Sequence, residues 1–137
     1  MPSGNDAPLG LVDPDNLLDE TVSTKTYAGI FHQLFHASYF SQRATSEKAL
    51  EYLLESVYDR GLVAGLPKNI KVAHKFGERY SESNEIIQLH DCGIIYYPDN
   101  PYSLCVMTKG KSISELEEVI SEISQRVYEE FERRDHE

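Results

Sequence analysis

The chain has 137 residues, 40% of them hydrophobic, and this size and composition predict one compact domain with a buried core. Its 23 acidic residues outnumber the 13 basic ones, and the resulting formal net charge of -10 disfavours a nucleic-acid or a membrane-surface role. No apolar run approaches the roughly 18 residues that a spanning helix needs, and the first residues do not resemble a signal peptide.

The first half of the chain predicts two helices after an irregular leading segment. Residues 1–22 are rich in Pro, Gly, Asp and Asn, which favour turns. From Ser23, apolar residues recur at helical spacing and predict a helix to about Phe40. A second apolar stripe predicts a helix from about Thr45 to Gly61, where the glycines and the proline of "GLVAGLPKN" interrupt it.

The second half predicts three strands and a helix. Alternating apolar residues indicate strands near 69–78, 86–97 and 102–109, and the short "PDNP" turn between the last two favours an antiparallel meander. A capping box then begins an amphipathic helix over 112–131, and residues 132–137 are expected to fray. The expected fold class is therefore α/β: an antiparallel sheet of about three strands with flanking helices.

Neither pair of neighbouring polar residues predicts a metal or catalytic site. His32 and His36 stand four residues apart on a helix, as metal ligands do, but they lie away from its apolar stripe, and a glutamine stands between them where a metalloprotease helix carries glutamate. His90 and Asp91 are adjacent on a strand, so their side chains point to opposite faces and cannot form a hydrogen-bonded pair. We expect no metal and no cofactor.

The two cysteines are expected to be reduced packing residues. With the turn centred on Asp99-Asn100, Cys105 lies opposite Ile94, and Cys92 is its diagonal neighbour at roughly 7 Å, the limit for a disulfide. The chain also contains no Ser-x-x-Lys and no Gly-x-Ser-x-Gly, so no serine nucleophile is recognisable.

The stretch "VAHKFGERY" places a lysine and a glycine on one strand. A glycine there allows close approach to the backbone, and Lys75 offers a positive charge, which together suit an anion or a developing oxyanion. A surface lysine beside a turn glycine is the alternative explanation.

Four stretches in this order, "GLVAGLP", "VAHKFGE", "LHDCGIIYY" and "YSLCVMT", resemble the C-terminal part of the class A β-lactamase-like serine hydrolases, which are related to the penicillin-binding D,D-peptidases. The resemblance runs from about Ser23 to Tyr128 and treats 23–131 as a partial domain of that family.

The resemblance implies a role for four consecutive residues, because Lys75-Phe76-Gly77 stands where the family carries Lys-Thr/Ser-Gly. Lys75 would supply positive potential to a substrate carboxylate and to proton transfer. Gly77 would let the acyl group lie against the strand, and the backbone N–H of Glu78 would donate to the oxyanion. Phe76 departs from the pattern, because a phenyl ring cannot replace the hydroxyl that binds the substrate carboxylate.

The family's nucleophile motifs have no counterpart in the matched stretches. Ser3-Gly4-Asn5 spells Ser-x-Asn without a preceding helix, and Glu20 lacks the asparagine that follows the family's deacylating glutamate. The resemblance implies acyl transfer on a β-lactam or peptide carbonyl, and hence β-lactam catabolism, in a protein that is typically periplasmic or at the cell surface. This chain alone is expected to be inactive. The resemblance also leaves open two other functions: a D,D-peptidase or an esterase of the same fold, and a non-catalytic binding or scaffolding protein. The 102–109 strand edge is expected to invite self-association or pairing with an upstream half.

Overall fold

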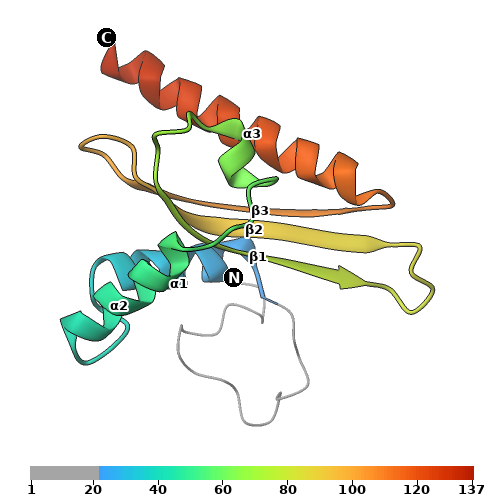
Figure 1. The fold of residues 1–137 in the computed structure, drawn as a ribbon, viewed down its shortest axis with the longest axis horizontal. Helices are drawn as coiled ribbons and strands as arrows, with labels where there is room; N and C mark the ends of the chain where they lie inside the picture. Colours follow the sequence, from blue (N-terminus) through green and yellow to red (C-terminus); the bar gives the residue numbers. More distant parts are fainter. Residues whose placement is uncertain (1–21) are drawn as a thin grey trace, which may run out of the picture.

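The computed structural model describes residues 22–137 as three layers, with a central sheet between two layers of helices. Helix α3 covers one face of the sheet, and α1 and α2 cover the other (Figure 1). The elements are α1 (Thr24–Phe35), α2 (Arg43–Leu54), the 3-10 helix η2 (Leu62–Gly65), β1 (Val72–Tyr80), β2 (Ile87–Ile95), β3 (Tyr102–Gly110) and α3 (Ile113–Asp135). The expected α/β class is confirmed. None of the helices in the described residues is long and apolar enough to cross a membrane.

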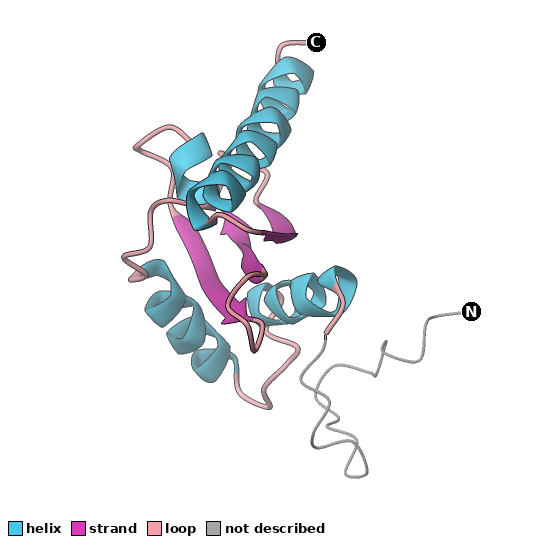
Figure 2. Cartoon of the chain, turned by 90° about the vertical axis from the view of Figure 1, so that its right-hand side faces the viewer, coloured by secondary structure: helices cyan, strands magenta, loops and turns pink. Residues whose placement is uncertain are grey.

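The sheet is an antiparallel meander in the order β1-β2-β3, as the sequence predicts. Gly77 pairs with His90, and His90 pairs with Met107. Because side chains alternate along a strand, these three residues share one face with every second residue on either side. Figure 2 shows the helices on both sides of the strands.

The face under α3 carries the larger core. Leu89, Ile95 and Val106 of the sheet pack against Leu116 and Ile120 of α3. Leu62 of η2 joins them and is fully buried. On the other face, Ala73, Cys92 and Ile94 form a smaller cluster with Phe31 of α1.

Both N-terminal helices end earlier than predicted. Helix α1 ends at Phe35, and Ala37 has a φ of 54°, a left-handed conformation that stops the helix. Helix α2 begins at Arg43 and ends at Leu54, well before Gly61. The chain after α2 has to pass from the α1 and α2 face of the sheet to the α3 face, so it cannot remain helical. Val57, an apolar residue inside the helix predicted to reach Gly61, is 94% exposed on this crossing.

The C-terminal helix is longer than predicted. Ser112 caps it by accepting a hydrogen bond from the Glu115 backbone N–H. It continues through the expected frayed residues to Asp135, where ion pairs from Arg133 and Arg134 to Glu130 support the last turns.

The prediction of reduced cysteines is wrong. Cys92 and Cys105 are directly opposite each other, with Cα atoms 4.0 Å apart, and they form a disulfide between β2 and β3. The prediction misplaced the turn. Ile95 pairs with Tyr102, so the turn is centred one residue earlier than expected and the partner of Cys105 shifts from Ile94 to Cys92.

Candidate functional site

The site suggested by the sequence lies on the outer edge of β1. Among the described residues β1 pairs only with β2, so its other edge is open. The Phe76 carbonyl accepts a hydrogen bond of 2.5 Å from Lys75 Nζ, which places that carbonyl at the open edge. Because backbone direction alternates along an antiparallel strand, Glu78 directs its N–H to the same side. The edge therefore presents a lysine and a backbone donor together.

Position 77 needs a glycine because the side chain of His90 packs directly against it. A Cβ atom at Gly77 would lie 2.4 Å from Cε1 and 2.8 Å from Nε2 of His90, so the imidazole ring rests directly on the glycine backbone. Tyr27 of α1 contacts the same ring edge-on, with ring centroids 5.3 Å apart. Partial burial and, secondarily, the positive charge of Lys75 lower the pKa of His90, although Asp91 opposes this. His90 thus lies beside Gly77 and close to Lys75, a neighbourhood that the sequence alone did not predict.

The face of the sheet around His90 is basic. At the twelve positions of the three strands that share this face, the charged residues are Lys75, Arg79 and Lys109, and none is acidic. Helix α1, which packs on this face, contains no aspartate or glutamate, and the two glutamates of α2, Glu47 and Glu51, pair with Arg43 and Lys48 of the same helix. In a chain of net charge -10, this concentration of positive charge favours anions.

Phe76 faces the opposite way, as the alternation predicts. Its ring stacks on Tyr58 with centroids 3.9 Å apart, and the Tyr58 hydroxyl donates to Glu117 Oε1 of α3 at 3.2 Å. Arg60 Nε donates to the same oxygen at 2.9 Å. Burial and the Glu117 carboxylate raise the pKa of Tyr58. These residues line a hollow of about 460 Å³ on the α3 side of the sheet. Phe76 therefore packs against the loop that carries Tyr58 and does not point toward the face that carries Lys75.

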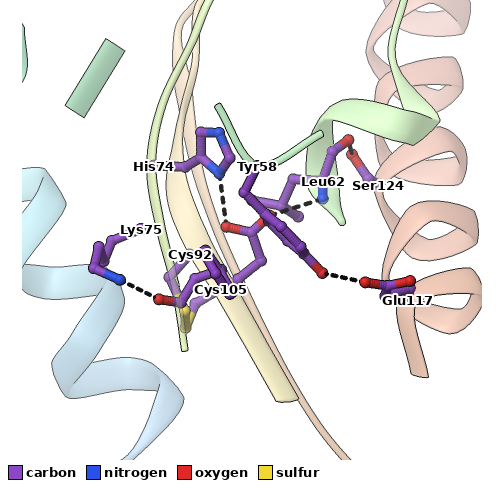
Figure 3. Close-up of polar contacts among 10 residues, drawn as sticks. Tyr58, Leu62, His74, Lys75, Cys92, Cys105, Glu117 and Ser124 are labelled. Carbon is purple, nitrogen blue, oxygen red and sulfur yellow. Dashed lines mark hydrogen bonds and ion pairs between the residues drawn. A yellow bond between two sulfur atoms is a disulfide. The ribbon is translucent and has the colours of Figure 1, made fainter. Parts of the chain in front are cut away.

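A buried network of hydrogen bonds holds the strands of the site against η2 and α3 (Figure 3). His74 Nδ1 lies 2.8 Å from Asp91 Oδ1, and both side chains are almost completely buried. Asp91 Oδ2 accepts from the Leu62 N–H at 2.9 Å, and the Leu62 carbonyl accepts from Ser124 Oγ at 2.7 Å. The network connects β1, β2, η2 and α3.

The histidine predictions are partly confirmed. His90 and Asp91 do lie on opposite faces of the sheet, but Asp91 pairs with His74, the residue directly before the motif on β1. The sequence contained the signal: polar residues at inward positions of adjacent strands. The rings of His32 and His36 lie 4.3 Å apart on exposed helix surface. Within residues 22–137, no group of three or more metal-binding side chains is present.

Two motif positions lie outside the described residues. Ser3-Gly4-Asn5 and Glu20 belong to the stretch before residue 22, and the leading segment predicted over 1–22 does as well, apart from its last residue.

Fold and motif together define the class of protein as one that shares the C-terminal part of a class A β-lactamase domain. A family model described as "Beta-lactamase enzyme family" matches residues 5–131, and the chain therefore belongs to that family.

Solved structures give the same result for the fold. PBP-A is similar at 24% identity with a TM-score of 0.68, over 82% of this chain and 40% of that one. The TLA-3 extended-spectrum β-lactamase is 21% identical with a TM-score of 0.72, over 80% of this chain and 42% of that one. A β-lactamase from Chitinophaga pinensis is 21% identical with a TM-score of 0.70, over 79% of this chain and 41% of that one. The chain spans about two fifths of these structures. A comparison with curated proteins found no match.

Proposed function

We propose that this chain forms the substrate-edge portion of a serine hydrolase that transfers acyl groups from a β-lactam or peptide carbonyl. In this function Lys75 supplies positive potential in the groove, Gly77 admits the acyl group, and the Glu78 N–H donates to the oxyanion. The observation that carries the proposal is the open β1 edge, where Lys75 and the outward backbone groups of Phe76 and Glu78 lie together.

The comparisons support the reaction class. Among the similar structures is a PBP-A variant described as an acyl-enzyme complex with penicillin G, at 23% identity and a TM-score of 0.66. An acyl-enzyme requires a nucleophile, and the 137 residues contain no Ser-x-x-Lys. The proposal therefore assigns the nucleophile to a polypeptide segment that the present sequence does not contain.

The outer edge of β3 is the proposed contact for that segment. Within the described residues β3 pairs only with β2, which leaves its other edge open. Val119 and Ile123 of α3, which packs against β3, are 45% and 38% exposed. An open edge beside apolar surface invites an added strand, supplied by the remaining part of the domain or, more weakly, by a second copy of this chain.

Reconstitution tests the proposal. The 137-residue chain is mixed with a polypeptide that carries the remaining part of a related domain, including its Ser-x-x-Lys, and acylation by a fluorescent penicillin is followed by mass spectrometry. We expect no acylation by this chain alone, acylation of the partner serine in the mixture, and a loss of at least tenfold in rate with Lys75→Ala.

Lys71→Ala is the matched control, because Lys71 is an exposed lysine just before β1 and away from the edge motif. Acylation that is equally fast in the Lys75→Ala mixture would contradict the proposal. A complex that forms without any acylation would favour the binding or scaffolding alternative.

A further inference from the structure

The basic face around His90 has a shape as well as a charge. Beside His90 the surface is hollowed to about 290 Å³, and Gln88, Met107 and Lys109 are among the residues that line the hollow. At about 30 Å³ per water molecule, this volume accommodates a carboxylate with a short apolar body. The hollow lies on the same face as Lys75 and Gly77.

His90 occupies the middle of this face. Lys75 on β1 and Lys109 on β3 lie on opposite diagonals of His90 in the strand register, each within reach of a long side chain. The Lys75 ammonium has no acidic partner among the described residues; it donates to the Phe76 carbonyl and lies 4.9 Å from the centroid of the Phe76 ring, so it has to turn across the strand to meet an anion at His90. An anion at His90 would therefore be approached by cations from two sides.

We propose that His90, Lys75 and Lys109 form a carboxylate-binding site in which His90 takes up a proton when the ligand binds. The ligand is a short peptide-like acid that occupies the hollow beside His90, with its carboxylate at the imidazole. The inference deepens the proposed function, because it rests on the β1 edge being a substrate groove. It also assigns carboxylate recognition to a titrating residue, since Phe76 has no hydroxyl to offer and points to the α3 face.

The groups around His90 determine the sign of the pH dependence. Lys75 and Arg79 lie at its two diagonals on β1, Asp91 is its neighbour on β2 but on the opposite face, and Tyr27 contacts it from α1. From β3, the directly paired residue Met107 does not titrate, and Lys109 lines the hollow. Burial and Lys75 lower the pKa of the free imidazole and so favour its neutral form, whereas a bound carboxylate favours the imidazolium. Affinity therefore rises as the pH falls through the pKa of His90.

The test uses the full oxidised chain and two probes, N-acetyl-alanyl-alanine with a free carboxylate and the same dipeptide as its C-terminal amide. Binding is followed by NMR titration at pH 5.5 and pH 7.5, where the ligand carboxylate stays ionised because its pKa is about 3.5. We expect the acid to bind at least threefold more tightly at pH 5.5, within the limit of about tenfold per pH unit for one linked proton. The amide should bind more weakly and without pH dependence.

Variants separate charge from structure. His90→Gln should abolish the pH dependence and bind as the wild type does at pH 7.5, whereas His90→Arg, with a permanent charge, should bind tightly at both pH values. Lys75→Gln should weaken binding at both pH values. His136→Gln, an exposed histidine at the end of α3, is the control and should retain the full pH dependence.

Three results would overturn the inference: unchanged pH dependence in His90→Gln, equal binding of acid and amide, or no binding of the acid at either pH. None of them requires a nucleophile. The carboxylate site can therefore fail while acylation in the reconstituted mixture succeeds, and the reverse also holds.

Discussion

The buried Asp91 carboxylate makes a quantitative prediction about stability. It accepts hydrogen bonds from two buried donors, His74 Nδ1–H and the Leu62 N–H. Asp91→Ala removes the acceptor for both, and each buried donor left without a partner costs about 1–3 kcal/mol, so the free energy of unfolding should fall by about 2–6 kcal/mol. For a domain whose total stability is about 5–15 kcal/mol, this change brings the protein close to unfolding.

Asp91→Asn separates the hydrogen bonds from the charge. The amide oxygen can still accept from Leu62, and the amide nitrogen can donate to the other tautomer of His74, so we expect a loss of only about 1–2 kcal/mol. Urea denaturation followed by circular dichroism measures both variants, with exposed Asp59→Ala as the control near zero. Equal losses for the alanine and asparagine variants would refute the reasoning, because the network would then not depend on the acceptors of residue 91.

Three further predictions concern the disulfide, Gly77 and the end of α3. Reduction of the Cys92–Cys105 disulfide, 13 residues apart in sequence, should raise the mass by two daltons and lower the free energy of unfolding by about 3 kcal/mol; a native mass that already matches two thiols would contradict the structure. Gly77→Ala should displace the imidazole of His90, seen as a shift of its NMR signals beyond that caused by the exposed control Ser83→Ala. The two arginines that hydrogen-bond Glu130 lower its pKa to about 2, so the ion pairs should persist as the pH falls through 4.5 and be lost only near pH 2; an NMR titration of Glu130 with a midpoint near 4.5 would contradict this.

The sequence predicts this fold well where local chemistry decides the structure. Ser23 and Ser112 begin their helices as predicted, because a hydroxyl that accepts from the first turn acts within a few residues. The end of α2 depends instead on where the chain has to go next, which is a tertiary requirement. The strand pairing failed for a geometric reason: moving the centre of an antiparallel turn by one residue moves each cross-strand partner by two, and this was enough to hide the disulfide.

The candidate site, too, could be predicted only where its residues are close in sequence. Lys75 and Gly77 could be recognised because they are adjacent in a motif, whereas His90 could not, because its importance lies in being opposite Gly77 on the next strand. His74 and Asp91 are 17 residues apart and meet only after β1 and β2 have paired. Residues that act through cross-strand contacts are therefore found reliably only once the register is known.

Phe76 explains how the motif can lose a hydroxyl without losing the fold. Its ring stacks on Tyr58, which is hydrogen-bonded to Glu117, so this position connects the β1 edge to α3 through the loop before η2. A smaller hydroxyl residue would give up that stacking contact while adding a polar group on the face away from His90. The α3 side of β1 is thus organised for packing and the α1 side for charge, and the alternation of side chains along one strand keeps the two tasks apart. The proposed recognition of a carboxylate at His90 therefore does not depend on Phe76, because the two side chains lie on opposite faces of the sheet.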